Sequence, residues 1–226
     1  MTHLVVHIST IKDGSMYNRN DLFDASVIRN RQKFLNTHGI QPNQTTRLSF
    51  AYNTETSPYC RYTILKAKHK GLGMADDATL DVDAIVTTQP NHALFLPVAD
   101  CIGAVLYDPE HEVLMLSHLG RHSLEQEGAI KSVDFLVKNL QANPTKLRVW
   151  LTPAAGKENY PIWALNNSGM KETAFKQLKK AGVAENNIID NPADTTVDHT
   201  YYSYSEFLKG HRPEDGDHAI VAMMTE

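Results

Sequence analysis

Apolar residues in the middle of the chain form short runs rich in β-branched and aromatic side chains. Residues 93–98, 102–107 and 113–117 are three such runs, and their length and composition are typical of strands. Asp108-Pro109-Glu110 lies between the last two runs and is typical of a tight turn. The pattern therefore predicts three strands, of which the second and third form a hairpin.

Longer segments show apolar side chains at helical spacing. The clearest follows Ser123, because Ser123 and Gln126 have the spacing of a capping box and apolar residues then recur at helical spacing as far as Leu140. Further helices are predicted over residues 25–38 and 169–181, each followed by a glycine. Other strands are predicted at residues 4–9, 48–52, 59–66, 147–151, 188–190, 200–204 and 219–224. Strands interspersed with helices, without a repeat or a linker, predict one α+β domain over residues 1–226.

Composition limits the classes of function. The 226 residues are 42% hydrophobic, enough for a substantial core, and carry a net charge of -4 without a basic run. Binding to nucleic acid or to a membrane surface through bulk electrostatics is therefore not expected. The first residues lack the features of a secretory signal, no window approaches the roughly 20 apolar residues of a membrane span, and the cysteines are too few for a disulfide framework. We expect a cytoplasmic protein.

Cys101 and His118 are the first candidates for chemistry. Asp100-Cys101 lies at a predicted strand junction and His118 at a strand end, so one sheet would hold both residues beside a cleft. A thiolate, an imidazole and a third donor form an open zinc site. The same residues also suit a nucleophile with its base, or a buried cysteine that is only a small apolar side chain. Asp100 would either orient His118 or accept structural hydrogen bonds.

Arg31 is a further candidate. It lies on or beside the apolar side of the predicted helix 25–38, four residues after Val27. A buried cation needs a partner, since its desolvation is costly. That partner is either a neighbouring carboxylate or a bound anion such as phosphate.

Three motifs of the central stretch resemble those of the laccase-domain family, also called multicopper polyphenol oxidases or YfiH/FAMIN-type purine nucleoside phosphorylases. The family motifs A-D-A-x-V-T, A-D-C and H-A-G-W-R-G correspond in order to Val82-Asp83-Ala84 with Thr87, Ala99-Asp100-Cys101, and Ser117-His118-Leu119-Gly120. Weaker matches extend the resemblance over nearly the whole chain, at Asn30-Arg31, Thr152-Pro153 with Tyr160, and residues 201–204.

The resemblance implies a single laccase-like domain built as an α/β/β/α layered sandwich of YfiH type. It also implies phosphorolysis of adenosine, inosine and methylthioadenosine, with some adenosine deamination at the same site, and hence a transferase and hydrolase that takes a purine nucleoside and phosphate. The residues implied as catalytic are Cys101, His118, Arg31 and Asp100, and those implied as substrate-binding are Asn30, Arg31, Tyr52, Arg121 and Tyr160. Zn²⁺ would be bound by Cys101, His118 and one further ligand.

The sequence departs from the family at that third ligand. The family has a histidine in the motif Q-V-H-G, but the corresponding count from Arg31 falls on Phe50-Ala51-Tyr52. The candidate substitutes are His69 and His122. His122 follows His118 by four residues, yet Gly120 and the cap predicted at Ser123 indicate a loop rather than a helix there.

Copper is not expected, because copper centres need a His₂Cys site or a cluster of histidines and the chain has no His-x-His or His-Cys-His sequence. Two interpretations remain. One is a zinc-dependent enzyme acting on a purine nucleoside, and the other is a non-catalytic small-molecule-binding protein whose metal site has decayed. A polyphenol oxidase, as the family name suggests, is less favoured.

Overall fold

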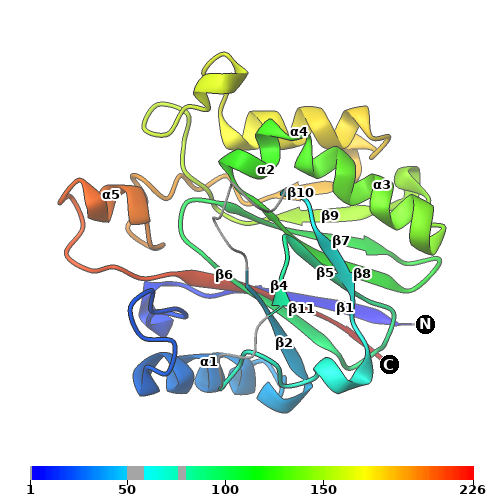
Figure 1. Ribbon diagram of the computed structural model, residues 1–226, viewed down its shortest axis with the longest axis horizontal. Helices are drawn as coiled ribbons and strands as arrows, with labels where there is room; N and C mark the ends of the chain where they lie inside the picture. Colours follow the sequence, from blue (N-terminus) through cyan, green and yellow to red (C-terminus); the bar gives the residue numbers. More distant parts are fainter. Residues whose placement is uncertain (1, 50–58, 76–79) are drawn as a thin grey trace.

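The computed structural model describes residues 2–49, 59–75 and 80–226. Two β-sheets lie face to face, with helices on their outer faces (Figure 1). The first sheet has the spatial order β1 (His3–Ile8), β11 (His218–Thr225), β6 (Ala93–Val98), β2 (Thr45–Ser49) and β4 (Leu80–Asp81). The second has the order β10 (Ile188–Asp190), β9 (Arg148–Leu151), β7 (Ile102–Asp108), β8 (Val113–Leu119), β5 (Ala84–Thr87) and β3 (Tyr62–Ile64).

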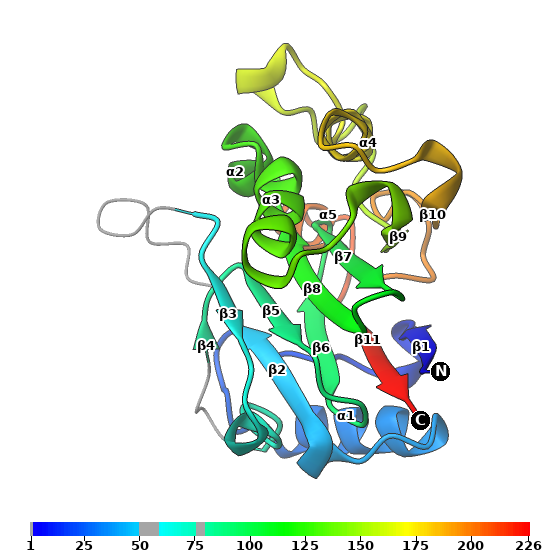
Figure 2. The ribbon, with the colours of Figure 1, turned by 90° about the vertical axis from the view of Figure 1, so that its right-hand side faces the viewer.

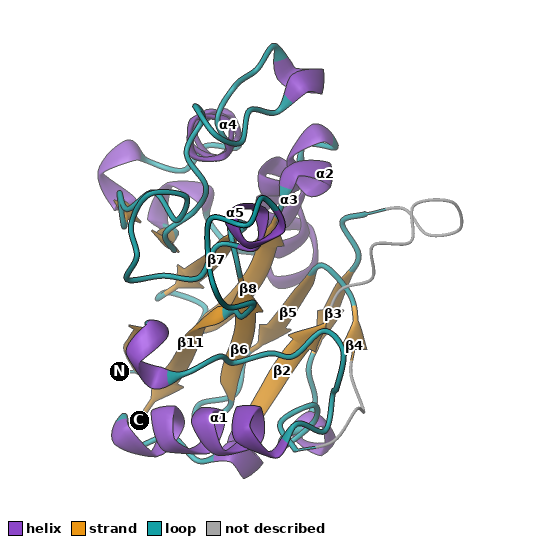
Figure 3. Cartoon of the chain, turned by 90° about the vertical axis from the view of Figure 1, so that its left-hand side faces the viewer, coloured by secondary structure: helices purple, strands orange, loops and turns teal. Residues whose placement is uncertain are grey.

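The helices complete the layers. The helix α1 (Ala25–Thr37) packs on the first sheet, and α2 (Arg121–Glu125), α3 (Gly128–Leu140) and α4 (Met170–Lys180) pack on the second (Figure 2). The short helix α5 (Tyr204–Leu208) lies at one end of the sandwich (Figure 3). Short 3₁₀ turns occur at Ile11–Asp13, Pro42–Gln44, Ala67–His69, Pro144–Lys146, Trp163–Leu165 and Glu185–Asn187. The predicted α/β/β/α layered sandwich is confirmed.

The side chains of each strand point alternately to its two faces, which explains how the layers pack on one another. In β11, Ile220 and Ala222 face the core between the sheets, whereas Val221 and Met223 face the core beneath α1. Successive side chains of a strand point to opposite faces, so a strand covered on both sides is apolar throughout. The buried runs β6, β7 and β8 follow the same rule.

The central predictions are confirmed. The strand predicted over 93–98 is β6, and β7 and β8 form the predicted antiparallel hairpin, with Gly103 opposite His118 and Ala104 opposite Ser117. The helices predicted over 25–38 and 169–181 are α1 and α4, each within two residues of the expected ends.

Three predictions about secondary structure are wrong. The segment 200–204 is not a strand, because Tyr204 begins α5 and the hydroxyl of Ser203 caps it by accepting from the N–H of Glu206. The capping box at Ser123 does not form, since α2 begins at Arg121 and Glu127, in a left-handed conformation, separates it from α3. The strand predicted over 59–66 is shorter, as β3 spans Tyr62–Ile64. The strand predicted over 48–52 continues from β2 into residues that lie outside the described ones.

Across residues 2–49, 59–75 and 80–226, every helix is too short or too polar to cross a bilayer.

Candidate active site

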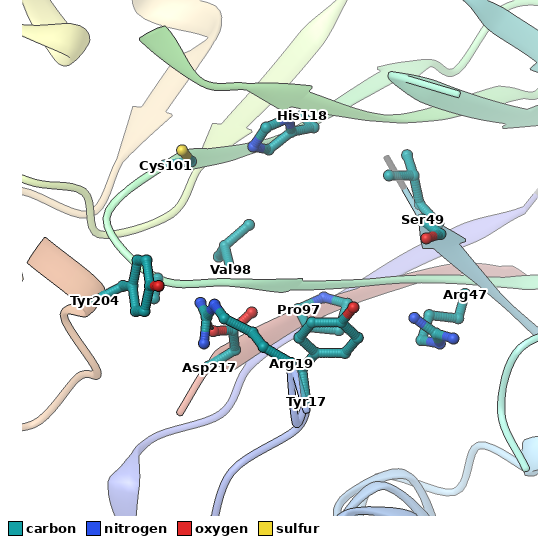
Figure 4. A pocket seen from close by; sticks show the side chains of 12 residues that line it. Tyr17, Arg19, Arg47, Ser49, Pro97, Val98, Cys101, His118, Tyr204 and Asp217 are labelled. Carbon is teal, nitrogen blue, oxygen red and sulfur yellow. Dashed lines mark hydrogen bonds and ion pairs between the residues drawn. The ribbon is translucent and has the colours of Figure 1, made fainter. Parts of the chain in front are cut away.

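The hairpin of β7 and β8 brings Cys101 and His118 together. Cys101 directly precedes β7, and His118 lies opposite Gly103 on β8. A Cβ atom added at Gly120 would lie 3.0 Å from the sulfur of Cys101 and 3.1 Å from Nε2 of His118. Cys101 and His118 lie side by side at the wall of a cavity (Figure 4). Both flank one point, which the absence of a side chain at Gly120 leaves clear.

Asp100 positions the loop that carries Cys101. Its backbone is left-handed, with φ at 74°, and its carbonyl accepts a hydrogen bond from the N–H of Ala155 at 2.8 Å. Its carboxylate accepts from the hydroxyl of Thr195 and from the N–H of Ser205, both at 2.7 Å. Asp100 is thus a structural acceptor, and both carboxylate oxygens are engaged away from His118.

Burial keeps both side chains of the pair neutral. Cys101 is partly exposed along the cavity, but burial raises the pKa of its thiol to about 12, with Asp100 and Asp217 adding to the increase. Burial also lowers the pKa of His118 to about 3. The backbone N–H of Arg121 donates toward the sulfur and acts in the opposite direction on the pKa of the thiol. At neutral pH the pair is a thiol beside an uncharged imidazole.

The larger cavity beside the pair has a volume of about 380 Å³. Its apolar surface is interrupted by two arginines that each lie over an aromatic ring: Arg19 is 4.0 Å from the centroid of Tyr204, and Arg47 is 5.7 Å from that of Tyr17. The residues that line it are Tyr17, Arg19, Arg47, Leu48, Ser49, Pro97, Val98, Ala99, Cys101, His118, Tyr204 and Asp217 (Figure 4). Such arginine–aromatic pairs hold a cation in a fixed, flat orientation.

Arg19 is held by two carboxylates. Its guanidinium lies 2.6 Å from the carboxylate of Asp215 and 2.5 Å from that of Asp217. Burial raises the pKa of Asp217 to about 6, although Arg19 acts to lower it. The charge of Arg19 is therefore balanced within the wall of the cavity.

A smaller cavity of about 170 Å³ adjoins the same pair. It is lined by Tyr59, Cys101, His118, Gly120, Arg121, His122, Ser123 and Tyr160. Cys101 and His118 line both cavities, so each cavity gives access to the same two side chains.

Arg31, which the resemblance implies as a catalytic and substrate-binding residue, is buried and is not among the described residues that line the two cavities. Its buried guanidinium donates from Nε to the carbonyl of Met16 at 2.8 Å and from Nη1 to that of Met74 at 3.3 Å. Burial and the nearby charge of Arg47 lower the pKa of Arg31 to about 9. Among the residues that the structure describes, no carboxylate forms an ion pair with Arg31, so backbone carbonyls replace both of the expected partners.

Asn30 and His69 also lie away from the pair. Nδ2 of Asn30 donates to the carbonyl of Ser15 at 3.0 Å, and Nδ1 of His69 accepts from the N–H of Lys66 at 3.0 Å within its own 3₁₀ turn. Neither residue is among the described residues that line the two cavities. The described structure therefore does not bring His69 together with Cys101 and His118. Tyr52 lies outside the described residues.

Three of the candidate residues from the sequence line the smaller cavity: Arg121, His122 and Tyr160. His122 belongs to the helix α2 and not to a loop, and its ring stacks on Tyr59 with 5.3 Å between centroids. Its Nε2 lies 3.2 Å from Nη2 of Arg121, and its Nδ1 lies 3.2 Å from Glu125. Both ring nitrogens thus already have partners.

The donors for zinc are incomplete in the described part of the chain. Cys101 and His118 flank one point, but no group of three His, Cys, Asp or Glu side chains among the described residues could hold a metal ion. A catalytic zinc site has three protein ligands. The donor set that is present supplies two of them.

Sequence reasoning missed Tyr17, Arg19, Arg47 and Asp217. The first two lie in a stretch without periodicity, and Asp217 precedes a strand, so no local pattern marks them. Arg47 gives a signal, because a charged residue in the middle of the buried strand β2 needs a reason to be there.

Comparisons with known proteins identify the family and the fold. Residues 17–168 match the family model described as multi-copper polyphenol oxidoreductase laccase. A purine nucleoside phosphorylase of Corynebacterium glutamicum is 26% identical over 137 residues, which are 61% of this chain and 51% of that protein. The match thus spans about half the length of the curated relative.

Solved structures resemble the whole chain. YlmD from Geobacillus stearothermophilus has a TM-score of 0.85 at 18% identity, covering 99% of this chain and 92% of that one. The hypothetical protein YfiH of Bacillus licheniformis has a TM-score of 0.80 at 18% identity, covering 97% of this chain and 92% of that one. These likenesses establish the fold. With the family model covering most of the sequence, the chain belongs to the multi-copper polyphenol oxidoreductase laccase family and has the YfiH-type fold.

Proposed function

We propose that the chain is an enzyme that cleaves purine nucleosides by phosphorolysis. The observation that carries the proposal is the Cys101–His118 pair at the wall of a cavity of about 380 Å³. Pockets for small organic ligands have volumes of roughly 300–1,000 Å³, and a purine nucleoside belongs to that class. The relative named as a purine nucleoside phosphorylase supports the same class of substrate.

Phosphorolysis of a purine nucleoside requires a site that binds the flat base and a group that transfers one proton. An oxygen of phosphate bonds to C1′ of the sugar while the bond from C1′ to the base nitrogen breaks, and the base takes up a proton. The neutral thiol and imidazole of Cys101 and His118 can hold or pass that proton at the edge of the ligand. Arg19, stacked on Tyr204 and held by Asp217, presents a rigid planar group against which a base packs.

Zinc stays a prediction. If it binds, Cys101 and His118 would hold it, and the metal would act as a Lewis acid beside the substrate. The stacking role of Arg19 does not depend on the metal, whereas the proton role of Cys101 and His118 applies to the metal-free pair, because zinc ligands are deprotonated. Metal analysis of the purified protein tests the point, with near-stoichiometric zinc that disappears in Cys101→Ser as the supporting result and Cys60→Ser as the matched control.

The test of the activity is product analysis with inosine or adenosine in phosphate buffer. Free base and sugar 1-phosphate should appear together, and adenosine should also yield inosine if deamination occurs. His118→Ala and Cys101→Ser should lower the rate, whereas the exposed His199→Ala should not. Base released without sugar phosphate would contradict phosphorolysis.

A second candidate is a nucleoside-binding protein without activity. The incomplete set of metal donors among the described residues favours it. Calorimetric binding of inosine that depends on Arg19 or Tyr204, without any product, would select this candidate over the enzyme.

A further inference from the structure

Arg121 is an arginine of the smaller cavity for which the described residues supply no ion pair. Nη2 donates to Nε2 of His122, but none of the described carboxylates forms an ion pair with it. The carboxylate of Glu125 lies 3.2 Å from Nδ1 of His122. Nε of Arg121 is buried and, among the described atoms, lacks a hydrogen-bond acceptor. A buried donor without an acceptor is costly, which indicates that something else completes this site.

Tyr59 provides a second unmatched group in the same cavity. Its ring lines the smaller cavity and stacks on His122, and its hydroxyl is buried without a partner in the described structure. Arg121 lies close enough to act on the pKa of this phenol, lowering it against the larger effect of burial. Two donors from distant parts of the sequence thus face one small space.

The volume and the donors select the kind of ligand. At about 170 Å³ the cavity is smaller than pockets for organic ligands of drug size. An arginine and a hydroxyl are typical partners of an oxyanion, because guanidinium N–H groups match the oxygens of phosphate in charge and spacing. A cation would instead meet the charge of Arg121.

We propose that the smaller cavity is the binding site for inorganic phosphate, held by Arg121 and Tyr59. The proposal rests on the proposed function, for which phosphate is the second substrate. Since Cys101 and His118 line both cavities, phosphate in the smaller one and a nucleoside in the larger one meet at this pair. The anion site predicted at Arg31 thereby moves to Arg121.

The experiment is calorimetric titration of inorganic phosphate into the full chain without nucleoside. Arg121→Met keeps the length of the side chain and removes the charge, and it should weaken binding by about 10- to 100-fold, the effect of losing a charged hydrogen bond. Arg121→Lys keeps the charge and should bind more weakly than wild type but more tightly than Arg121→Met. Tyr59→Phe should also weaken binding. The exposed Arg29→Met is the matched control and should bind as wild type does.

The outcomes separate this site from the activity. Phosphate binding that depends on Arg121, in a protein that yields no product from nucleosides, supports the site and overturns the phosphorylase. Phosphorolysis with an unchanged KM for phosphate in Arg121→Met supports the phosphorylase and overturns the site. A wild-type protein that binds no phosphate, or a folded Arg121→Met and Arg121→Lys that bind it normally, also overturns the site. Thermal unfolding of each variant checks that it is folded.

Discussion

Asp100 and Ser205 are joined by a hydrogen bond across 105 positions of the sequence, with the N–H of Ser205 donating to Oδ2 of Asp100 at 2.7 Å. Thr195 donates to the other carboxylate oxygen. One side chain therefore holds the loop before Cys101, the segment at Thr195 and the start of α5, which carries Tyr204 into the larger cavity. The shape of that cavity depends on this carboxylate.

Asp100→Asn should destabilise the protein by about 1.5–3 kcal/mol, because one acceptor oxygen becomes a donor that faces another donor. Asparagine tolerates the left-handed backbone at φ 74°, so the change isolates the hydrogen bond from backbone strain. Urea unfolding measures the effect. Thr195→Val removes a single donor and should cost about 1 kcal/mol. An Asp100→Asn variant as stable as wild type would show that the carboxylate does not organise these segments.

Gly120→Ala should lower activity with a modest loss of stability. The added Cβ would lie 2.8 Å from Cε1 of His118 and 3.0 Å from the sulfur of Cys101, closer than side chains normally approach, so the pair must move apart. The backbone at Gly120 has a φ of -83°, which alanine adopts without strain. Gly169→Ala, whose Cβ would meet only Lys157, with the closest atom at 3.1 Å, is the matched control for nucleoside turnover. Equal turnover in both variants would contradict the role of the pair.

Arg31→Met should lower stability by about 2–4 kcal/mol, because charged hydrogen bonds to the buried carbonyls of Met16 and Met74 are lost. Phosphate affinity of the folded variant should stay at the wild-type value. Denaturant unfolding and phosphate titration on the same preparation measure the two quantities. The reverse result, normal stability with phosphate binding lost, would return the anion site to Arg31.

His218 should make the protein less stable in acid. Burial lowers its pKa to about 3, whereas an unfolded histidine has a pKa of about 6.5. Between these values the unfolded state binds more protons, so the contribution is complete above about pH 6.5 and is lost as the pH falls. Between pH 7 and pH 4 the free energy of unfolding should fall by about 3 kcal/mol less in His218→Leu than in the wild type. Urea unfolding at several pH values measures it.

The control for this pH dependence is His199→Gln, since His199 is exposed. It should follow the wild-type curve. His118, whose pKa burial also lowers to about 3, keeps a similar dependence in the His218→Leu variant, so the curve should become shallower and not flat. Parallel curves for wild type and His218→Leu would mean that His218 is not held neutral.

Local patterns in the sequence determined the central strands β6, β7 and β8 and the Cys101–His118 pair. A run such as Ala93–Val98 is apolar throughout because the strand is covered on both faces. The pair follows from the β7–β8 hairpin, in which a short turn sets the register and so brings two nearby residues together. The motifs around these residues also pointed to the family.

Only the tertiary structure decided which other groups meet the pair. Tyr17, Arg19, Tyr204 and Asp217 reach the larger cavity from segments far apart in the sequence. The spacing of Arg31 and Arg121 in the sequence could not show which of them is the better candidate for binding an anion, because the partners of a buried charge depend on tertiary packing. The fold places backbone carbonyls around Arg31 and an open cavity beside Arg121. Such contacts between distant segments depend on how the layers stack and not on the periodicity within one segment.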